Sequence, residues 1–192
     1  DEQGRVAAQG TVEVPITIQI PRSVAEGRAG MRPARVLQFG HGFFGNRSEV
    51  DSGFLREFAN ESGIVLIAAD WAGMSDEDTA PLLLTMSERP SEAFRILDRV
   101  HQGMANFLAL GFAVRGTLAE LEALHVDGQL VYDPQQLYFY GISQGHILGG
   151  TFVALSPHIE RAVLGSGGCT FSFMMFRSWH FNSFLLIISQ LL

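Results

Sequence analysis

The feature that most constrains the fold is a serine between two glycines, at the junction of two secondary-structure patterns. The segment Gly141-Ile142-Ser143-Gln144-Gly145 follows the apolar run Leu137–Tyr140 and precedes a helical pattern that ends at Leu155. A strand that turns directly into a helix presents its turn residue at the carboxyl edge of a sheet, beside the positive end of the helix. The sequence therefore predicts an exposed Ser143 in a strained turn, with flanking glycines that relieve Cβ clashes.

A second junction supports this interpretation. The strand-like run Val36–Phe39 ends in the sequence Gly40-His41-Gly42-Phe43-Phe44-Gly45, about 100 residues before Ser143. In acyl-transfer enzymes with a serine of this kind, a His-Gly turn after an early strand supplies a backbone amide to the reacting oxygen. The two motifs together carry much more weight than either alone.

The rest of the chain alternates between strand-like and helix-like patterns. Ile64–Ala69 is a continuous apolar run, which suits a parallel strand buried on both faces. Thr11–Ile20 alternates with period two, and Pro15 within it indicates an edge strand or a bulge. A further strand is expected at Arg161–Gly165, and helical patterns cover 49–62, 91–114 and 144–155. This alternation predicts an α/β fold with a three-layer, doubly wound, mostly parallel sheet.

Local signals predict the connections between these elements. Residues 21–33 carry Gly, Arg and Pro and are expected to form a loop. Ser75 and Asp78 have the spacing of a capping box that opens a short helix. Asp133-Pro134 is expected to form a turn ahead of the strand that leads to Ser143.

These motifs and their order resemble the α/β-hydrolase superfamily, particularly its serine esterases and lipase-like members, over roughly residues 12 to 170. The resemblance implies that Ser143 is the nucleophile and that the backbone amides of Phe43 and Gln144 form the oxyanion hole. It implies supporting roles for Gly42, which lets the backbone approach the substrate, for His41, which braces the turn, and for Gly141 and Gly145.

Composition excludes several other chemistries. All 13 cationic residues are arginines, so a P-loop lysine, a Schiff-base lysine and a Ser-Lys dyad are excluded within this chain. The single cysteine, Cys169, excludes an intrachain disulfide and a Cys-rich zinc site. A net charge of −7 argues against a nucleic-acid surface. The resemblance implies a small-molecule ester as substrate, and with these exclusions we expect no cofactor, no metal and no transmembrane segment.

The expected triad is incomplete. The superfamily order is serine, then acid, then histidine. After Ser143 there is no Asp, the only Glu is Glu160, and the histidines are His146, His158 and His180. We expect His146 and His158 to point away from Ser143, and His180 lacks the strand-end context of a triad histidine. Asp70 precedes Ser143 and is expected to brace a loop.

The incomplete triad leads to an expectation about the whole protein. The chain is expected to stop after the sixth strand of an eight-strand plan, with the triad acid and histidine beyond residue 192. These 192 residues would then be inactive alone, and the C-terminal remainder of the protein would be their partner. Residues 1–169 would form the hydrolase core, and residues 170–192, rich in Phe and Met, the start of a cap, lid or helical segment.

The resemblance implies a serine hydrolase that cleaves a carboxylic ester, with an apolar acyl group favoured by the Phe- and Met-rich segment. Two alternatives stay open. The same residues could transfer the acyl group to an alcohol or cleave a peptide, and a hydrolase fold without a triad could bind an apolar ligand or partner without catalysis. The resemblance to this superfamily favours a secreted or cell-envelope location.

Overall fold

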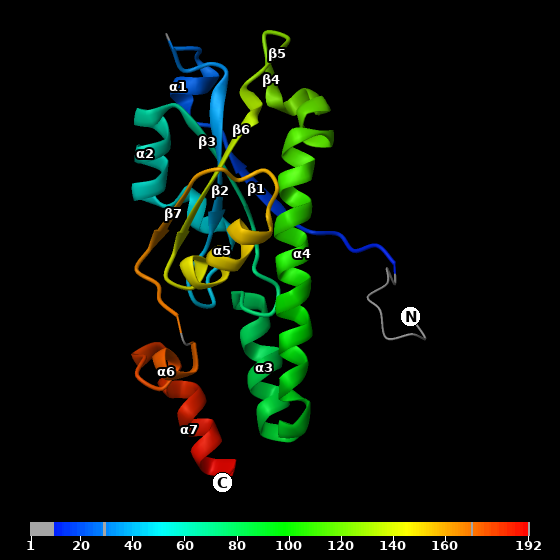
Figure 1. Cartoon of the computed structure of the whole chain (residues 1–192), viewed down its shortest axis with the longest axis vertical. Helices are drawn as coiled ribbons and strands as arrows, with labels where there is room; N and C mark the ends of the chain where they lie inside the picture. Colours follow the sequence, from blue (N-terminus) through cyan, green and yellow to red (C-terminus); the bar gives the residue numbers. More distant parts are fainter. Residues whose placement is uncertain (1–9, 29, 170, 192) are drawn as a thin grey trace.

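The computed structural model describes residues 10–28, 30–169 and 171–191. Its centre is a five-stranded sheet in the order β1-β3-β2-β6-β7, and a two-stranded ribbon, β4-β5, lies apart from it (Figure 1). The sheet strands are β1 (Ile16–Gln19), β2 (Ala34–Gly40), β3 (Ile64–Ala69), β6 (Tyr132–Ile142) and β7 (Ala162–Gly165). The ribbon strands are β4 (His125–Val126) and β5 (Gln129–Leu130). All neighbouring pairs in the sheet are parallel except β1 with β3.

Helices cover both faces of this sheet. The α-helices are α1 (Arg22–Ala25), α2 (Gly53–Ser62), α3 (Asp76–Glu88), α4 (Ile96–Arg115), α5 (Gln144–Leu155), α6 (Phe171–Met175) and α7 (Asn182–Leu191). Short 3₁₀ helices are η1 (Arg47–Asp51), η2 (Pro90–Arg95), η3 (Thr117–Glu120), η4 (Glu122–Leu124) and η5 (Trp179–Phe181). Helix α2 packs on one face, and α4 and α5 pack on the other. This confirms the predicted three-layer α/β fold.

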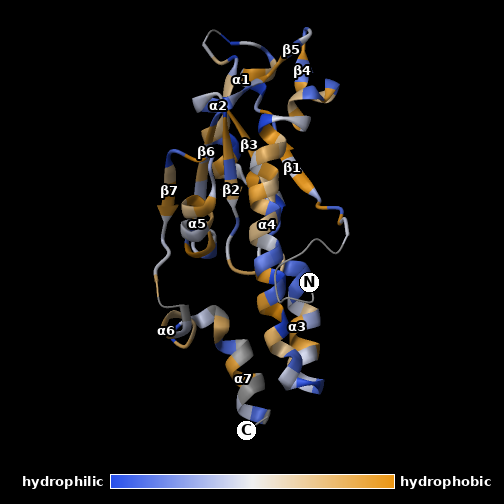
Figure 2. Cartoon of the chain, turned by 45° about the vertical axis from the view of Figure 1, so that its right-hand side comes forward, coloured by the Kyte–Doolittle hydropathy of each residue, from blue (hydrophilic) through white to orange (hydrophobic). Residues whose placement is uncertain are grey.

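Strand β3 shows why a continuous apolar run predicts a central strand. Val65, Ile67 and Ala69 belong to the core beneath α4 and α5, whereas Leu66 and Ala68 belong to the core beneath α2. Successive side chains of a strand point to opposite faces, so a strand covered on both faces needs apolar residues at every position. Figure 2 shows the apolar colour concentrated on the strands and on the part of α4 beside the sheet.

The expected bounds of one strand, one loop and one helix differ from those in the structure. Only Ile16–Gln19 of the predicted strand 11–20 pairs with β3, and Pro15, which has no N–H to donate, lies just before this edge strand. The expected loop at 21–33 contains the short helix α1. The predicted helix 91–114 begins as the 3₁₀ helix η2 and becomes α-helical only at Ile96.

The expected turn at Asp133-Pro134 lies inside strand β6. The two-residue step from Ala34 to Val36 on β2 faces the five-residue step from Tyr132 to Leu137 on β6. Asp133 accepts a hydrogen bond from the backbone N–H of Gln135, 2.9 Å away, so the local turn chemistry is present. Because β6 pairs with β2 both before and after Asp133-Pro134, these two residues form part of a bulge within the strand and do not precede it.

Parallel strands bring four loops to one edge. The carboxyl ends of β2, β3, β6 and β7 all meet the lower edge of the sheet in Figure 1, and α3, the start of α4, α6 and α7 lie beyond that edge. The predicted capping box at Ser75 and Asp78 is confirmed, and it opens the 13-residue helix α3 directly at this edge. The candidate site is built from these loops.

Candidate active site

Ser143 connects β6 to α5 in the strained conformation that its sequence predicts. Its φ is 56° and its ψ is −115°, and its side chain is exposed. The backbone is held on both sides: the Ser143 N–H donates to Gly165 O (2.9 Å), and the Ser143 carbonyl accepts from the N–H of His146 (3.0 Å). A non-glycine residue at positive φ costs on the order of 1–3 kcal/mol and persists only when its surroundings fix it.

The flanking glycines relieve Cβ clashes, as their sequence predicts. Neither Gly141 nor Gly145 has a positive φ. A Cβ on Gly145 would instead overlap the carbonyl of Gly40, and a Cβ on Gly141 would overlap the carbonyl of Gly145. A Cβ on Gly40 would lie 3.2 Å from Gly145 Cα. The three glycines therefore let the end of β2, the end of β6 and the start of α5 touch backbone to backbone.

His41 is buried beside this contact and has both ring nitrogens bonded. The N–H of Trp71 donates to Nε2 over 2.8 Å, so Nε2 is unprotonated, and Nδ1 donates to the carbonyl of Gly42 over 2.9 Å. Burial lowers the pKa of His41 below 6.5, although the Gly42 carbonyl and the Glu49 carboxylate oppose this shift. A neutral His41 therefore ties the loop after β3 to the loop after β2.

The carbonyl of Gly42 determines where the next amide points. It accepts from His41 Nδ1 and also from the N–H of Gly45, 3.1 Å away. In a planar trans peptide the N–H lies opposite the carbonyl, so the Phe43 N–H points away from His41. The N–H of Gly42 itself is occupied, because it donates to the Glu49 carboxylate over 3.2 Å.

The structure brings Ser143, Phe43 and Gln144 to one cavity of about 110 Å³. Gln144 is the first residue of α5, and the backbone N–H groups of a first helical turn have no acceptor within the helix. The remaining walls come from α5 and from the segment that begins with α6. They are formed by Ile147, Met174, Met175 and Ser178.

Two further contacts fix the neighbouring loops. The carboxylate of Asp70 accepts from the backbone N–H of Arg47 over 2.6 Å and pairs with the Arg47 guanidinium, in agreement with the expected loop-bracing role of Asp70. The side chain of Gln144 is buried and donates from Nε2 to the carbonyl of Met74 over 3.0 Å. Sequence reasoning assigned a role only to the Gln144 backbone, and no local signal indicates that its side chain reaches residue 74.

Solved structures are similar to this chain in fold. The protein from Klebsiella pneumoniae subsp. pneumoniae designated a dienelactone hydrolase has a TM-score of 0.51 and 17% sequence identity, and the match covers 85% of this chain and 57% of that one. The chain has the α/β-hydrolase fold.

Other comparisons are more distant. The match to S-formylglutathione hydrolase from Staphylococcus aureus has a TM-score of 0.45 and 17% identity, and covers 93% of this chain and 61% of that one. This chain thus spans less than two thirds of the length of either solved protein. No family model and no curated protein sequence matches it.

The histidines that follow Ser143 in this hydrolase fold have other contacts. His146 accepts at Nδ1 from the N–H of Gly167, 2.9 Å away, and a Cβ on Gly167 would overlap the His146 ring. The ring of His158 lies 4.5 Å from that of Phe112 on α4. The side chain of His180 lies outside the described part of the structure, and Glu160 is exposed just before β7.

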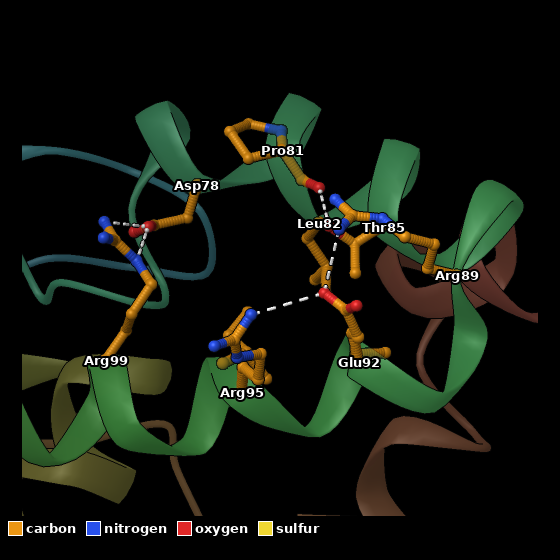
Figure 3. Close-up of a pocket in the computed structure, with 10 residues that line it drawn as sticks. Asp78, Pro81, Leu82, Thr85, Arg89, Glu92, Arg95 and Arg99 are labelled. Carbon is orange, nitrogen blue, oxygen red and sulfur yellow. Dashed lines mark hydrogen bonds and ion pairs between the residues drawn. The ribbon is translucent and has the colours of Figure 1, made fainter.

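A second and larger cavity, of about 210 Å³, lies between α3, η2 and α4 of the hydrolase fold (Figure 3). Arg89 and Arg95 both pair with one oxygen of Glu92, at 3.1 and 3.3 Å. Arg99 donates from Nε to Asp78 over 2.8 Å. The hydroxyl of Thr85, which also lines this cavity, donates to the carbonyl of Pro81. The described residues that line this cavity form charge pairs and include no serine, cysteine or histidine.

Within residues 10–28, 30–169 and 171–191, no group of three or more His, Cys, Asp or Glu side chains is arranged to hold a metal ion. Over the same ranges, no helix combines the length and apolar character needed to cross a bilayer.

Proposed function

We propose that this chain is the nucleophile-bearing part of a serine hydrolase that cleaves a carboxylic ester through an acyl-enzyme on Ser143. One observation carries the proposal: an exposed serine at φ 56° shares a cavity with Phe43 and with the first residue of α5. A reactive hydroxyl needs a fixed position beside donors that stabilise the charge which develops on the substrate oxygen. The strained turn and the adjacent helix end supply this arrangement.

In the proposed reaction, Ser143 Oγ attacks the ester carbonyl carbon and loses its proton to a general base. The carbonyl oxygen becomes an oxyanion, which accepts hydrogen bonds from the backbone amides of Phe43 and Gln144. Collapse of this intermediate expels the alcohol, which takes up the proton, and leaves an acyl-Ser143 ester. Water then attacks that ester with the same base, releases the carboxylic acid and restores the serine.

We propose that the base is a histidine outside these 192 residues, oriented by an acid that is also outside them. The contacts of three histidines in the described residues support this. His41 uses both nitrogens within its loop, His146 accepts from Gly167, and His158 packs on Phe112. None of these bonds leads to Ser143.

The cavity walls favour a short apolar acyl group. Phe43, Ile147 and Met174 present apolar side chains to the space beside Ser143. Its volume of about 110 Å³ is somewhat smaller than the roughly 150 Å³ cavity that accommodates benzene in another protein. An acyl chain of about four carbons or fewer fits this volume. In this proposal residues 170–192 begin a cap whose Met174 and Met175 close the acyl side.

A fluorophosphonate probe tests the proposal in the full-length protein. We expect the probe to label Ser143, and we expect Ser143→Ala to abolish labelling. Ser178→Ala, a change in another serine of the same cavity, serves as the matched control and should still be labelled. Absence of labelling under conditions where a known serine esterase reacts would reject the proposal. Comparing hydrolysis with transfer to added alcohol then separates an esterase from an acyltransferase.

A further inference from the structure

The loop between His41 and η1 folds around a carboxylate. Glu49 lies in η1, and its side chain returns to the start of the loop, where the N–H of Gly42 lies 3.2 Å from Oε2 and 3.4 Å from Oε1. A Cβ on Gly45 would overlap Glu49 Oε1, so only glycine at this position leaves room for the carboxylate. Two independent features of the loop, an amide and a missing side chain, therefore accommodate Glu49.

The loop needs such an anchor because its backbone is otherwise permissive. Glycine has more backbone freedom than any other residue, and Gly42 immediately precedes Phe43. Phe44 adopts a φ of 47°, which is unfavourable for a bulky residue. Glu49 holds the N–H of Gly42, while His41 and Gly45 hold its carbonyl. With both peptide planes around Gly42 fixed, the direction of the Phe43 N–H is fixed as well.

We propose that Glu49 is a positioning residue for the oxyanion hole: its carboxylate anchors the Gly42 amide and thereby aims the Phe43 amide at the cavity of Ser143. This inference rests on the proposed function. Glu49 does not line that cavity, so it acts through the loop and not on the substrate. Its negative charge would oppose a developing oxyanion, so its contribution comes from its geometry as a hydrogen-bond acceptor.

If Glu49 acts as a hydrogen-bond acceptor, two substitutions of it should have different effects. Glu49→Gln keeps an oxygen that can accept from Gly42, whereas Glu49→Ala removes it. For a short-chain ester we expect Glu49→Ala to lower kcat by roughly 10- to 100-fold, because losing or misplacing one oxyanion donor has effects of this order. KM should stay within about twofold, and Glu49→Gln should keep most of the kcat. Glu57→Ala, an exposed change on α2, is the matched control and should leave kcat unchanged.

Equal losses of kcat in Glu49→Gln and Glu49→Ala would overturn the proposal, and so would unchanged kcat in both. If Glu49→Ala fails to fold, Glu49→Asp replaces it: the charge stays but the shorter side chain withdraws from Gly42. We then expect Glu49→Asp to lose more kcat than Glu49→Gln, and the reverse order would overturn the proposal.

Hydrogen exchange of the Gly42 amide, measured by NMR without any substrate, tests the anchor independently of catalysis. Exchange should be clearly faster in Glu49→Ala than in wild type and intermediate in Glu49→Gln. Equal rates in all three proteins would overturn the anchor. A wild-type protein that neither reacts with fluorophosphonate nor hydrolyses esters would defeat the proposed function, while the exchange rates would still decide whether Glu49 holds the loop.

Discussion

The cavity at Ser143 and the cavity between α3, η2 and α4 differ in how their polar groups are held. The cavity between α3, η2 and α4 is about twice as large as the one at Ser143, at 210 against 110 Å³. Its arginines are mostly exposed, with 79% of the Arg95 side chain accessible. Arg89 and Arg95 share the carboxylate of Glu92 as their partner. At Ser143 the supporting groups, His41 and Gln144, are buried and bonded to backbone.

With Ser143 as the proposed nucleophile, this difference means that volume and charge are poor guides to the reactive site. Exposed ion pairs contribute about 0–1 kcal/mol each and rearrange readily, so they do not define a fixed geometry. Buried groups with hydrogen-bonded partners define one, because leaving a partner unsatisfied costs about 1–3 kcal/mol. The contrast predicts large effects for changes near Ser143 and small effects for changes among the exposed arginines.

The largest effect on stability is expected for Gly145→Ala. The added Cβ overlaps the carbonyl of Gly40, which is backbone and cannot turn away, so we expect a loss of about 3 kcal/mol. Thermal unfolding should show a Tm about 10 °C lower. Gly150→Ala on the same helix is the matched control, because its Cβ meets nothing within 4 Å. That change should be neutral or stabilising by up to about 1 kcal/mol.

Asp78→Ala tests the one buried side chain of the arginine-lined cavity. Only 3% of the Asp78 side chain is exposed, and it accepts from Gly73 N, from Ser75 N and Oγ, and from Arg99. We expect denaturant unfolding to show a loss of about 2–3 kcal/mol, because these donors are left unsatisfied. Asp98→Ala, an exposed change on α4, should cost less than about 1 kcal/mol. Similar losses in both variants would contradict the contrast between buried and exposed charges.

The pH dependence of stability should be smaller and confined to defined windows. Burial lowers the pKa of His41, so between pH 6.5 and the lowered value the unfolded chain binds a proton that the folded protein does not. Stability should therefore fall as pH drops below about 6.5, and the pKa of His158, also lowered by burial, adds in the same direction. The free energy of unfolding of His41→Asn should fall less steeply between pH 7 and pH 5 than that of wild type. An unchanged slope would refute the assignment to His41.

Asp78 contributes in a separate, acidic window. Burial alone would raise its pKa, but the bonds from Ser75 and Arg99 together lower it below 3.8. This contribution is therefore present above pH 3.8 and is lost as pH falls through the lowered value, so it does not affect the comparison at pH 5–7.

Arg95→Gln should have the smallest effect. Its partner Glu92 keeps the pair with Arg89, and the Arg95 side chain is largely exposed. We expect a change in the free energy of unfolding within about 0.5 kcal/mol and unchanged fluorophosphonate labelling of Ser143. Loss of labelling in this variant would mean that the two cavities are coupled, and the contrast drawn between them would fail.

The sequence predicts those features that depend on neighbouring residues. The strained Ser143 turn, the capping box at Ser75 and the buried strand Ile64–Ala69 all follow from local pattern, and the structure confirms them. The turn signal at Asp133-Pro134 is equally local, but pairing of β6 with β2 on both sides overrides it. Where a local turn signal and long-range strand pairing conflict, the strand pairing therefore determines the structure.

Contacts between distant loops could not be predicted. The sequence predicts that the flanking glycines relieve Cβ clashes, but it does not indicate that Gly145 meets the carbonyl of Gly40, about 100 residues away. The bond from the Gln144 side chain to Met74 likewise joins segments 70 residues apart. Nothing in the residues around Gln144 specifies this partner, because it depends on how the loops meet at the sheet edge.

For the proposed hydrolase, the division of the Ser143 cavity between two parts of the chain has a consequence for how specificity can evolve. The β2 loop and α5 contribute Phe43, Ser143, Gln144 and Ile147, whereas Met174, Met175 and Ser178 come from the segment after residue 170. Insertions, deletions or exchanges in that later segment would remodel one wall without touching the glycine contacts that position Ser143. A lineage could thus explore new ligands through one replaceable module while its reactive centre stays under separate selection.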